Sequence, residues 1–176
     1  IPEGTKISMN VSMKNSDYLH LIFKDDTIRK KTLNNFNYTK QVFESTPYHI
    51  ITSNTHNLSD TVSNYISIIK DEYPQINFSQ HYDSINTNFL FNGEIRDDYL
   101  TSQLTFNYEY IFNDTLDIVT KEVPIKGLNK ETFFYQFNFN DLLLTAGQEI
   151  KYYFIVWDND KINGHKKTIS KSFSYK

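Results

Sequence analysis

Acidic and amide side chains gather in three short stretches of this 176-residue chain, at residues 70–74, 93–99 and 157–164. The residues with side-chain oxygens that could act as ligands are Asp71, Glu72, Asp97, Asp98, Asp158, Asp160 and Asn163. A calcium ion takes about six to eight oxygen ligands from such side chains and from backbone carbonyls. If the fold brings the three stretches together, we therefore expect a calcium site there.

Two other roles for these side chains stay open. Asp and Asn accept hydrogen bonds from nearby backbone N–H groups, so they form turns without any ligand. The carboxylates could also pair with lysines of the N-terminal part of the chain. The loop at residues 158–164 is similar to an EF-hand loop, but it has an extra residue before Gly164 and lacks the glutamate that binds calcium through both oxygens.

The sequence contains no motif for enzyme chemistry. It has no cysteine, which excludes disulfides, thiolate metal sites and a cysteine nucleophile. Its five histidines are widely spaced and form no His-Glu-x-x-His pattern. No serine lies in a Gly-x-Ser-x-Gly elbow, and adjacent aspartates in turns are poor evidence for glycoside hydrolysis. We therefore predict a non-enzymatic protein with no small-molecule substrate.

The overall charge argues against nucleic-acid binding, which needs a basic face. The formal net charge is −3. Residues 1–70 carry eight Lys or Arg against six Asp or Glu, whereas residues 71–176 carry ten against fifteen. The acidic excess thus lies in the second part of the chain. No run approaches the roughly 20 apolar residues of a membrane span, so we expect no membrane contact by this segment.

Aromatic residues make up 16% of the chain, and this composition favours strands over helices. Residues 5–13 alternate between apolar and polar side chains, as a half-buried strand does. Strands in the first part are predicted at residues 5–13, 18–23, 36–38, 48–52 and 62–69. Asp25 and Asp26 are interpreted as a turn. The core residues predicted in the last of these strands are Val62, Ile66 and Ile68.

The second part of the chain has clearer strands. They are predicted at residues 75–80, 88–95, 104–110, 115–123, 132–139, 149–157 and 168–175, with a helical turn at 141–144. Seven strands at this spacing predict an immunoglobulin-like or fibronectin-III-like sandwich. Pro74 and the charged residues before it interrupt the strand patterns. We therefore predict an all-β fold of two tandem β-sandwich modules of this type, at residues 1–70 and 71–176.

Strand direction indicates where the acidic stretches lie. The first strand of the second module starts near Glu72. If successive strands run in alternate directions, the second strand ends near Asp98 and the sixth ends near Asp158. All three stretches then meet at the end of this module that faces the first module, which gives the calcium hypothesis its geometry.

Two aromatic features have more than one interpretation. Phe133, Tyr135, Phe137 and Phe139 occupy alternate positions and therefore one face of a strand. Such a row forms a carbohydrate-binding surface if it is exposed and a sandwich core if it faces inward. Alternation with polar residues favours the core. Trp157, the single tryptophan, is predicted to pack between the sheets at the end of its strand.

Several motifs occur in an order that matches a known family: residues 2–5, 70–74, 93–99 and 152–164, the last including Trp157-Asp158-Asn159-Asp160 and Asn163-Gly164. Together they resemble the extracytoplasmic segment of large, uncharacterised membrane-anchored proteins of Bacteroidetes-type bacteria. Leu100 departs from that pattern, which has a small residue there. The resemblance covers nearly the whole chain and implies tandem immunoglobulin-like modules on the periplasmic side of the cell envelope. The family has no established activity.

The resulting hypothesis is a structural spacer or protein–protein interaction segment of a bacterial envelope protein, with an acidic junction that binds calcium. The partner protein is not identified by the sequence. The alternative is a carbohydrate-binding or adhesive β-sandwich module. Because the chain begins without Met and ends in strand-like sequence, we expect it to belong to a longer, membrane-anchored protein.

Overall fold

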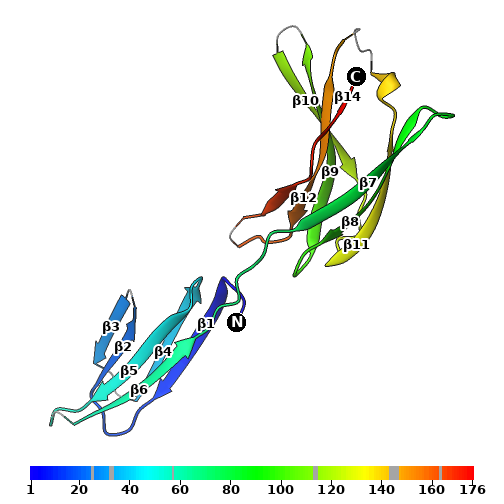
Figure 1. Ribbon diagram of the computed structural model, residues 1–176. Helices are drawn as coiled ribbons and strands as arrows, with labels where there is room; N and C mark the ends of the chain where they lie inside the picture. Colours follow the sequence, from blue (N-terminus) through cyan, green and yellow to red (C-terminus); the bar gives the residue numbers. More distant parts are fainter. Residues whose placement is uncertain (25, 32–33, 57, 113–114, 143–146, 163) are drawn as a thin grey trace. The chain divides into compact units, whose positions relative to one another are not determined.

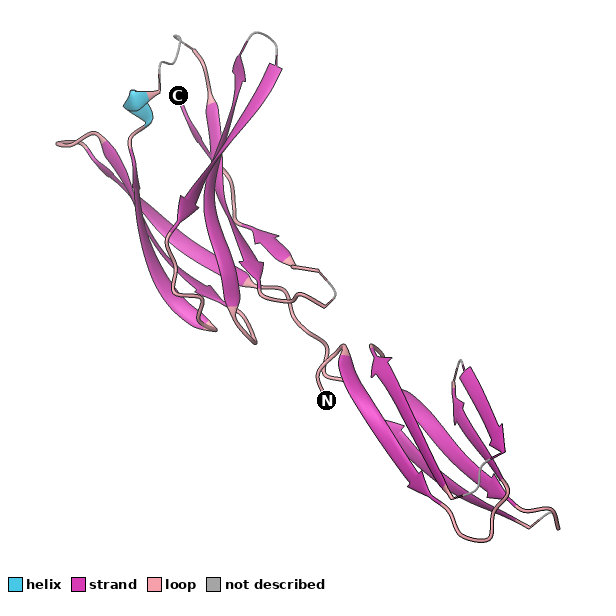
Figure 2. Cartoon of the chain, turned by 180° about the vertical axis from the view of Figure 1, so that it is seen from behind, coloured by secondary structure: helices cyan, strands magenta, loops and turns pink. Residues whose placement is uncertain are grey.

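The computed structural model describes residues 1–24, 26–31, 34–56, 58–112, 115–142, 147–162 and 164–176, and it is built from β-strands (Figure 1). Its Cα positions form two compact units, Ile1–Asp71 and Glu72–Lys176, which divide one residue after the predicted boundary. One helical turn, η1 (Phe139–Asp141), lies among the described strands (Figure 2). No helix within these ranges is both long and apolar enough to cross a membrane.

Unit 1 (Ile1–Asp71) is a small sandwich of two antiparallel sheets. Its strands are β1 (Thr5–Ser12), β2 (Tyr18–Phe23), β3 (Asp26–Lys31), β4 (Asn35–Val42), β5 (Thr46–Ser53) and β6 (Ser59–Ile66). β1 pairs with β4, and the other four strands form a sheet in the order β3-β2-β5-β6. The core between them is centred on Met13, Leu19, Leu21 and Phe23.

Two sequence predictions for unit 1 are wrong. Asp26, interpreted as a turn residue, begins strand β3 (Asp26–Lys31), which was not predicted, and Asp25 lies outside the described residues. Ile28 is the one apolar side chain of β3, so the sequence of this strand shows no alternation of apolar and polar residues from which it could be predicted. Val62 was predicted in the core but is 56% exposed, because β6 is an edge strand with side chains exposed along most of its length.

Unit 2 (Glu72–Lys176) is a larger sandwich. Its strands are β7 (Gln75–Asp83), β8 (Asn88–Arg96), β9 (Thr101–Phe112), β10 (Thr115–Val123), β11 (Lys130–Phe137), β12 (Ile150–Asp158), β13 (Lys167–Ile169) and β14 (Phe173–Tyr175). One sheet has the order β11-β8-β7 and the other β10-β9-β12-β13, with β14 also pairing with β12. The strand predicted at residues 168–175 is therefore two short strands, β13 and β14, which both pair with β12. The predicted all-β sandwich fold is confirmed.

The core of unit 2 is mainly aromatic. Phe91, Phe106, Tyr152 and Phe154 are fully or almost fully buried, and their rings contact one another. The inner face of β12 follows strict alternation, since every second residue from Ile150 to Asp158 is buried. Period-2 burial of this kind is what a strand in the middle of a sandwich requires.

Gly93 lies on the inner face of β8, between Phe78 of β7 and Phe133 of β11, its partners in the strand register. A Cβ atom added at Gly93 would lie 2.4 Å from Phe133 Cε1 and 2.8 Å from the Asn77 carbonyl oxygen. Aromatic side chains commonly cover sheet glycines in this way. The position therefore needs glycine because the Phe133 ring and the β7 backbone occupy the space of a side chain.

Two further predictions for unit 2 need correction. Trp157 does not pack between the sheets, because Val156 and Asp158 occupy the inward positions of β12 and Trp157 is on the other face, half-buried. The helical turn is η1, which starts two residues earlier than predicted, and residues 143 and 144 of the predicted turn lie outside the described residues. Its N-cap is Asn138, whose side chain accepts a hydrogen bond from Asn140 N.

Candidate functional site

The strand register brings most of the predicted acidic residues to one end of unit 2. β7 begins where β8 ends, since Gln75 pairs with Arg96. β12 ends where β9 begins, since Asp158 pairs with Thr101. The unit 2 residues at this acidic end are Glu72, Asp97, Asp98, Asp158 and Asp160. Asp71 is the last residue of unit 1, and Asn163 lies outside the described residues.

Glu72, Asp97 and Asp98 line an open hollow of about 320 Å³ together with Tyr73, Gln75 and Arg96. Its carboxylates accept backbone hydrogen bonds. Tyr99 N donates to Asp97 Oδ2 at 3.2 Å, and Glu72 N donates to Asp98 Oδ2 at 3.5 Å. These bonds fix the start of β7 against the loop that follows β8.

Asp158 organises the loop after β12 from inside the protein. Its side chain is 1% exposed, and Oδ1 accepts hydrogen bonds from Asp160 N at 3.1 Å and Lys166 N at 2.9 Å. Its backbone carbonyl oxygen lies 2.9 Å from His165 Nδ1. Asp160 Oδ1 in turn accepts from Ile162 N at 2.7 Å. Both aspartates therefore hold backbone amides of their own loop.

These contacts support the turn-forming role of Asp97, Asp158 and Asp160. Within the described ranges, no group of three or more His, Cys, Asp or Glu side chains is arranged to hold a metal ion. Asp71 accordingly contributes to no such group, and its backbone N–H donates to Glu3 Oε2 at 3.4 Å within unit 1. Calcium binding by the acidic end stays a prediction, for which a test is given below.

Glu131 at the start of β11 is a structural carboxylate that the sequence analysis missed. Its side chain accepts hydrogen bonds from Lys126 N at 2.7 Å, Gly127 N at 3.0 Å and Leu128 N at 3.0 Å, and from Thr101 Oγ1 at 3.1 Å. Burial acts to raise the pKa of Glu131, but these hydrogen bonds outweigh it and lower the pKa. The ionised carboxylate thus fixes the loop between β10 and β11. Gly127, at φ +74°, was the one signal in the sequence of a special turn there.

The aromatic rows of unit 2 belong to the core. Phe133 and Phe139 are buried, and Tyr135 and Phe137 pack against the same cluster. The Tyr108 ring is 5% exposed. Large exposed aromatic side chains of this unit, such as Tyr99 and Phe134, come from different elements. The core interpretation is therefore correct for these rows, and they offer no ring surface to a sugar.

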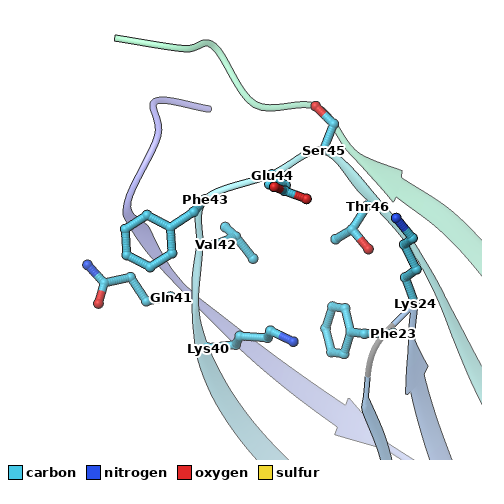
Figure 3. Close-up of a pocket in the computed structure, with 9 residues that line it drawn as sticks. All are labelled: Phe23, Lys24, Lys40, Gln41, Val42, Phe43, Glu44, Ser45 and Thr46. Atoms are coloured by element: carbon cyan, nitrogen blue, oxygen red, sulfur yellow. The ribbon is translucent and has the colours of Figure 1, made fainter. Parts of the chain in front are cut away.

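A small hollow in unit 1 lies where β4 turns into β5 (Figure 3). It measures about 200 Å³, and Figure 3 shows Lys40, Phe23 and Glu44 around it. Lys40 Nζ lies 4.4 Å from the centre of the Phe23 ring, a cation–π contact that covers the end of the core. The turn between β4 and β5 is stabilised by Lys70, whose Nζ donates to the Phe43 carbonyl oxygen at 2.9 Å. These contacts give Lys40 and Lys70 structural roles around the hollow.

An exposed aliphatic patch lies on the hairpin formed by β9 and β10. Its members, Ile111, Leu116 and Ile118, are 65%, 57% and 56% exposed. Leu116 pairs with Ile111 across the hairpin, and Ile118 follows two positions later on the same face. Glu109 pairs with Ile118 in register and forms an ion pair with Lys151 at 3.0 Å. This hairpin patch is therefore apolar with a charged border, a pattern typical of interaction sites.

No protein-family model matches the chain, and no curated protein is similar to it. One similar solved structure comes from a study of host cell surface retention of a 1.5-MDa bacterial ice-binding adhesin. The similarity covers 96% of this chain and 57% of that chain, at 13% sequence identity and a TM-score of 0.44. The chain thus spans less than two thirds of that structure, and a similarity of this strength does not establish a shared role.

Proposed function

We propose that this chain is a non-enzymatic structural segment that binds another protein through the outer surface of its sandwiches. The hairpin patch of Ile111, Leu116 and Ile118 is the observation that carries the proposal. The three aliphatic side chains are partly covered already, so a partner would remove their remaining apolar surface from water, which is favourable by about 25 cal/mol per Å². Their position on a hairpin, with the Glu109–Lys151 ion pair beside them, suits a partner that is apolar at its centre and polar at its rim.

The remaining polar groups support a structural role. Asp158 and Glu131 bind backbone amides of their own loops. Asn107, buried on the outer face of β9, donates to Thr105 Oγ1 and accepts from Thr120 Oγ1, both at 2.8 Å. Each of these side chains thus stabilises the sandwich. This use of polar groups supports the proposed role as a spacer.

The cellular location rests on the sequence resemblance. We place the chain on the periplasmic side of a bacterial envelope protein that is membrane-anchored elsewhere. For the carbohydrate-binding alternative, the motivating observation was the aromatic rows, and these rings lie in the core. An adhesive role through protein contacts falls within the proposal.

The proposal is tested by site-specific photo-cross-linking. A photoreactive side chain at Leu116 in the full chain, incubated with the envelope fraction of the source organism, is expected to give one discrete cross-linked product. Ile118→Lys should weaken that product about tenfold, because a charge at the apolar centre disrupts the contact. Glu122 lies on the same strand and face and serves as the control position. Products of equal yield from both positions, or no product from Leu116, would reject the proposal.

A further inference from the structure

One tripeptide recurs in the sequence: an aspartate, then a residue with a hydroxyl group, then an aliphatic residue. It occurs at residues 26–28, 60–62, 83–85 and 114–116. Of the chain's thirteen aspartates, these four alone precede a serine or threonine, and in each case the third residue is Ile, Val or Leu. Asp114 lies outside the described residues. The sites that the structure describes completely are therefore centred on Thr27, Thr61 and Ser84.

Each of these three sites lies beside a hairpin turn and on or next to an edge strand. Thr27 follows the turn between β2 and β3, and Thr61 follows the turn between β5 and β6. Ser84 is the first residue after β7, in the turn that leads to β8. β3 and β6 are the edges of the four-stranded sheet of unit 1, and β7 is an edge of the three-stranded sheet of unit 2. An edge strand has a neighbour on one side only, so each site has room for a bulky group.

The hydroxyl groups at these sites contribute nothing to the fold. Thr27, Thr61 and Ser84 are exposed, and within the described ranges their hydroxyl oxygens make no hydrogen bond. Two of the preceding aspartates bind the backbone instead. Asp60 Oδ1 accepts from Thr61 N at 2.8 Å, and Asp83 Oδ1 accepts from Ile85 N at 3.0 Å. The hydroxyl oxygens are therefore accessible to an enzyme that approaches from solvent.

The residue tendencies of turns and strands explain part of the tripeptide. An aspartate beside a hairpin turn accepts backbone hydrogen bonds, and a threonine after it favours the strand. These tendencies do not account for Ile85, which lies in the turn itself and is 90% exposed. Val62, the third residue of another tripeptide, is 56% exposed. Recognition of the tripeptide by another molecule accounts for all three of its positions.

We propose that Thr27, Thr61 and Ser84 are acceptor sites for O-linked sugars. In the transfer, the hydroxyl oxygen attacks the anomeric carbon of a sugar that carries a diphosphate leaving group. The bond between that carbon and the diphosphate breaks, and the hydroxyl proton passes to a base of the glycosyltransferase. The aspartate favours a neutral sugar over a phosphate, because a phosphate beside a carboxylate is repelled. Sugars are bulky, solubilising groups of protein surfaces, which suits exposed residues beside hairpin turns.

Sugars at these positions would also protect sheet edges. Edge strands present unpaired N–H and C=O groups with which other chains can pair. Thr27 and Thr61 lie within the edge strands β3 and β6, so a sugar on either residue obstructs the approach of another strand. This role goes beyond the proposed function, and none of the three residues belongs to the hairpin patch.

The test is mass spectrometry of the chain isolated from the envelope of its source organism. Thr27, Thr61 and Ser84 should each carry a mass increment of hexose or N-acetylhexosamine, located by fragmentation that keeps the sugar attached. Ser59 is the matched control, because it is exposed and lies two residues before Thr61 on the same face of β6, but follows no aspartate. It should be unmodified. Sugar on no more than one of the three sites, phosphate in its place, or equal modification of Ser59 would overturn the proposal.

Substitutions at one site show whether the tripeptide is read. Asp60→Asn should lower the modified fraction of Thr61 about tenfold, because the transferase loses a charge-assisted contact. Thr61→Ser keeps the hydroxyl and should keep the sugar, whereas Thr61→Val should lose it. Both residues are exposed on an edge strand, so the variants are expected to fold. Unchanged modification of Thr61 in Asp60→Asn would reject the proposal.

The outcomes for this inference and for the proposed function are separate. Loss of the hairpin cross-link in a chain that carries the sugars would remove the proposed function and leave the modification sites standing. An intact cross-link in a chain without sugars would do the reverse. Thr27 and Ser84 serve as internal controls for the Thr61 variants, since their sugars should be retained in every one of them.

Discussion

Unit 1 and unit 2 arrange their shared strands in the same order, yet they stabilise that arrangement differently. Unit 2 fills its core with large rings such as Phe91, Phe106 and Phe154. Unit 1 buries mainly Leu19, Leu21 and Phe23, and its smaller sheet has two strands against three in unit 2. The comparison shows that one strand order accepts cores of very different size. It also predicts that unit 1 unfolds first.

The largest expected effect comes from removing one central side chain in each unit. Phe154→Ala should cost about 3–5 kcal/mol and Leu21→Ala about 2–5 kcal/mol, because both side chains are almost completely buried. Calorimetry of the full chain should show two transitions, the lower one from unit 1. Leu21→Ala should shift the lower transition alone, and Phe154→Ala the upper one alone. A single transition that both variants shift equally would contradict independent units.

Gly93→Ala tests the close packing that is specific to unit 2. The added Cβ would force the Phe133 ring and the β7 backbone apart, which we expect to cost about 3 kcal/mol. Only the upper transition should move. Gly147→Ala is the control. Apart from its chain neighbours, no atom lies within 4 Å of the added Cβ, so the expected cost is only the backbone strain of an alanine at φ +86°. Equal effects from the two substitutions would refute the packing explanation.

Glu131→Gln tests whether a charged side chain holds the loop between β10 and β11. Loss of charge-assisted hydrogen bonds should destabilise unit 2 by about 1–3 kcal/mol at neutral pH. The pKa of Glu131 is lowered in the folded state, so its contribution is present above the ordinary carboxyl pKa and disappears as the pH falls through the lowered value. Urea unfolding at decreasing pH should therefore show the parent and variant converging. If the parent and Glu131→Gln still differ in unfolding free energy in strong acid, the effect comes from the altered side-chain packing and not from the lost charge.

The smallest expected effect concerns calcium at the acidic end of unit 2. A site with a dissociation constant of about 10⁻⁴ M would add about 1.4 kcal/mol at millimolar calcium. Because Asp97, Asp158 and Asp160 already accept backbone hydrogen bonds, the turn-forming role predicts no change in the upper melting temperature between calcium and chelator. A rise that Asp98→Asn removes would instead support the calcium hypothesis.

Alternation of side chains predicted most of the fold. It gave the inner faces of β1 and β11 correctly, because burial on a strand repeats every two residues. It failed for β3, where Ile28 is the one apolar residue. The prediction for Trp157 was wrong, because Trp157 follows inward-facing Val156 and therefore lies on the opposite face of β12.

The candidate site was harder to predict than the fold. Strand direction correctly brought Asp98 and Asp158 to the same end of unit 2. The role of Asp158, however, depends on the amide of Lys166, eight residues away across a loop. Glu131 likewise acts on three amides whose positions follow from the conformation of Gly127. Such contacts depend on loop geometry, which residue types alone do not specify.

The division of the last edge of unit 2 into β13 and β14 has a mechanical consequence. Each piece pairs with β12 over three residues. Between them, Ser170 N donates to the Phe154 carbonyl oxygen and Ser170 Oγ accepts from Phe154 N, both at 2.9 Å, before Lys171 and Ser172 leave the ladder. If this chain carries tension along its length, β14 is the strand nearest the end of unit 2 at Lys176. We expect it to detach before β13, uncovering Phe173 and Tyr175 while the ring cluster behind them stays intact. Unit 2 would then lengthen in steps under load, because β14 detaches from the sheet edge while the aromatic core stays folded.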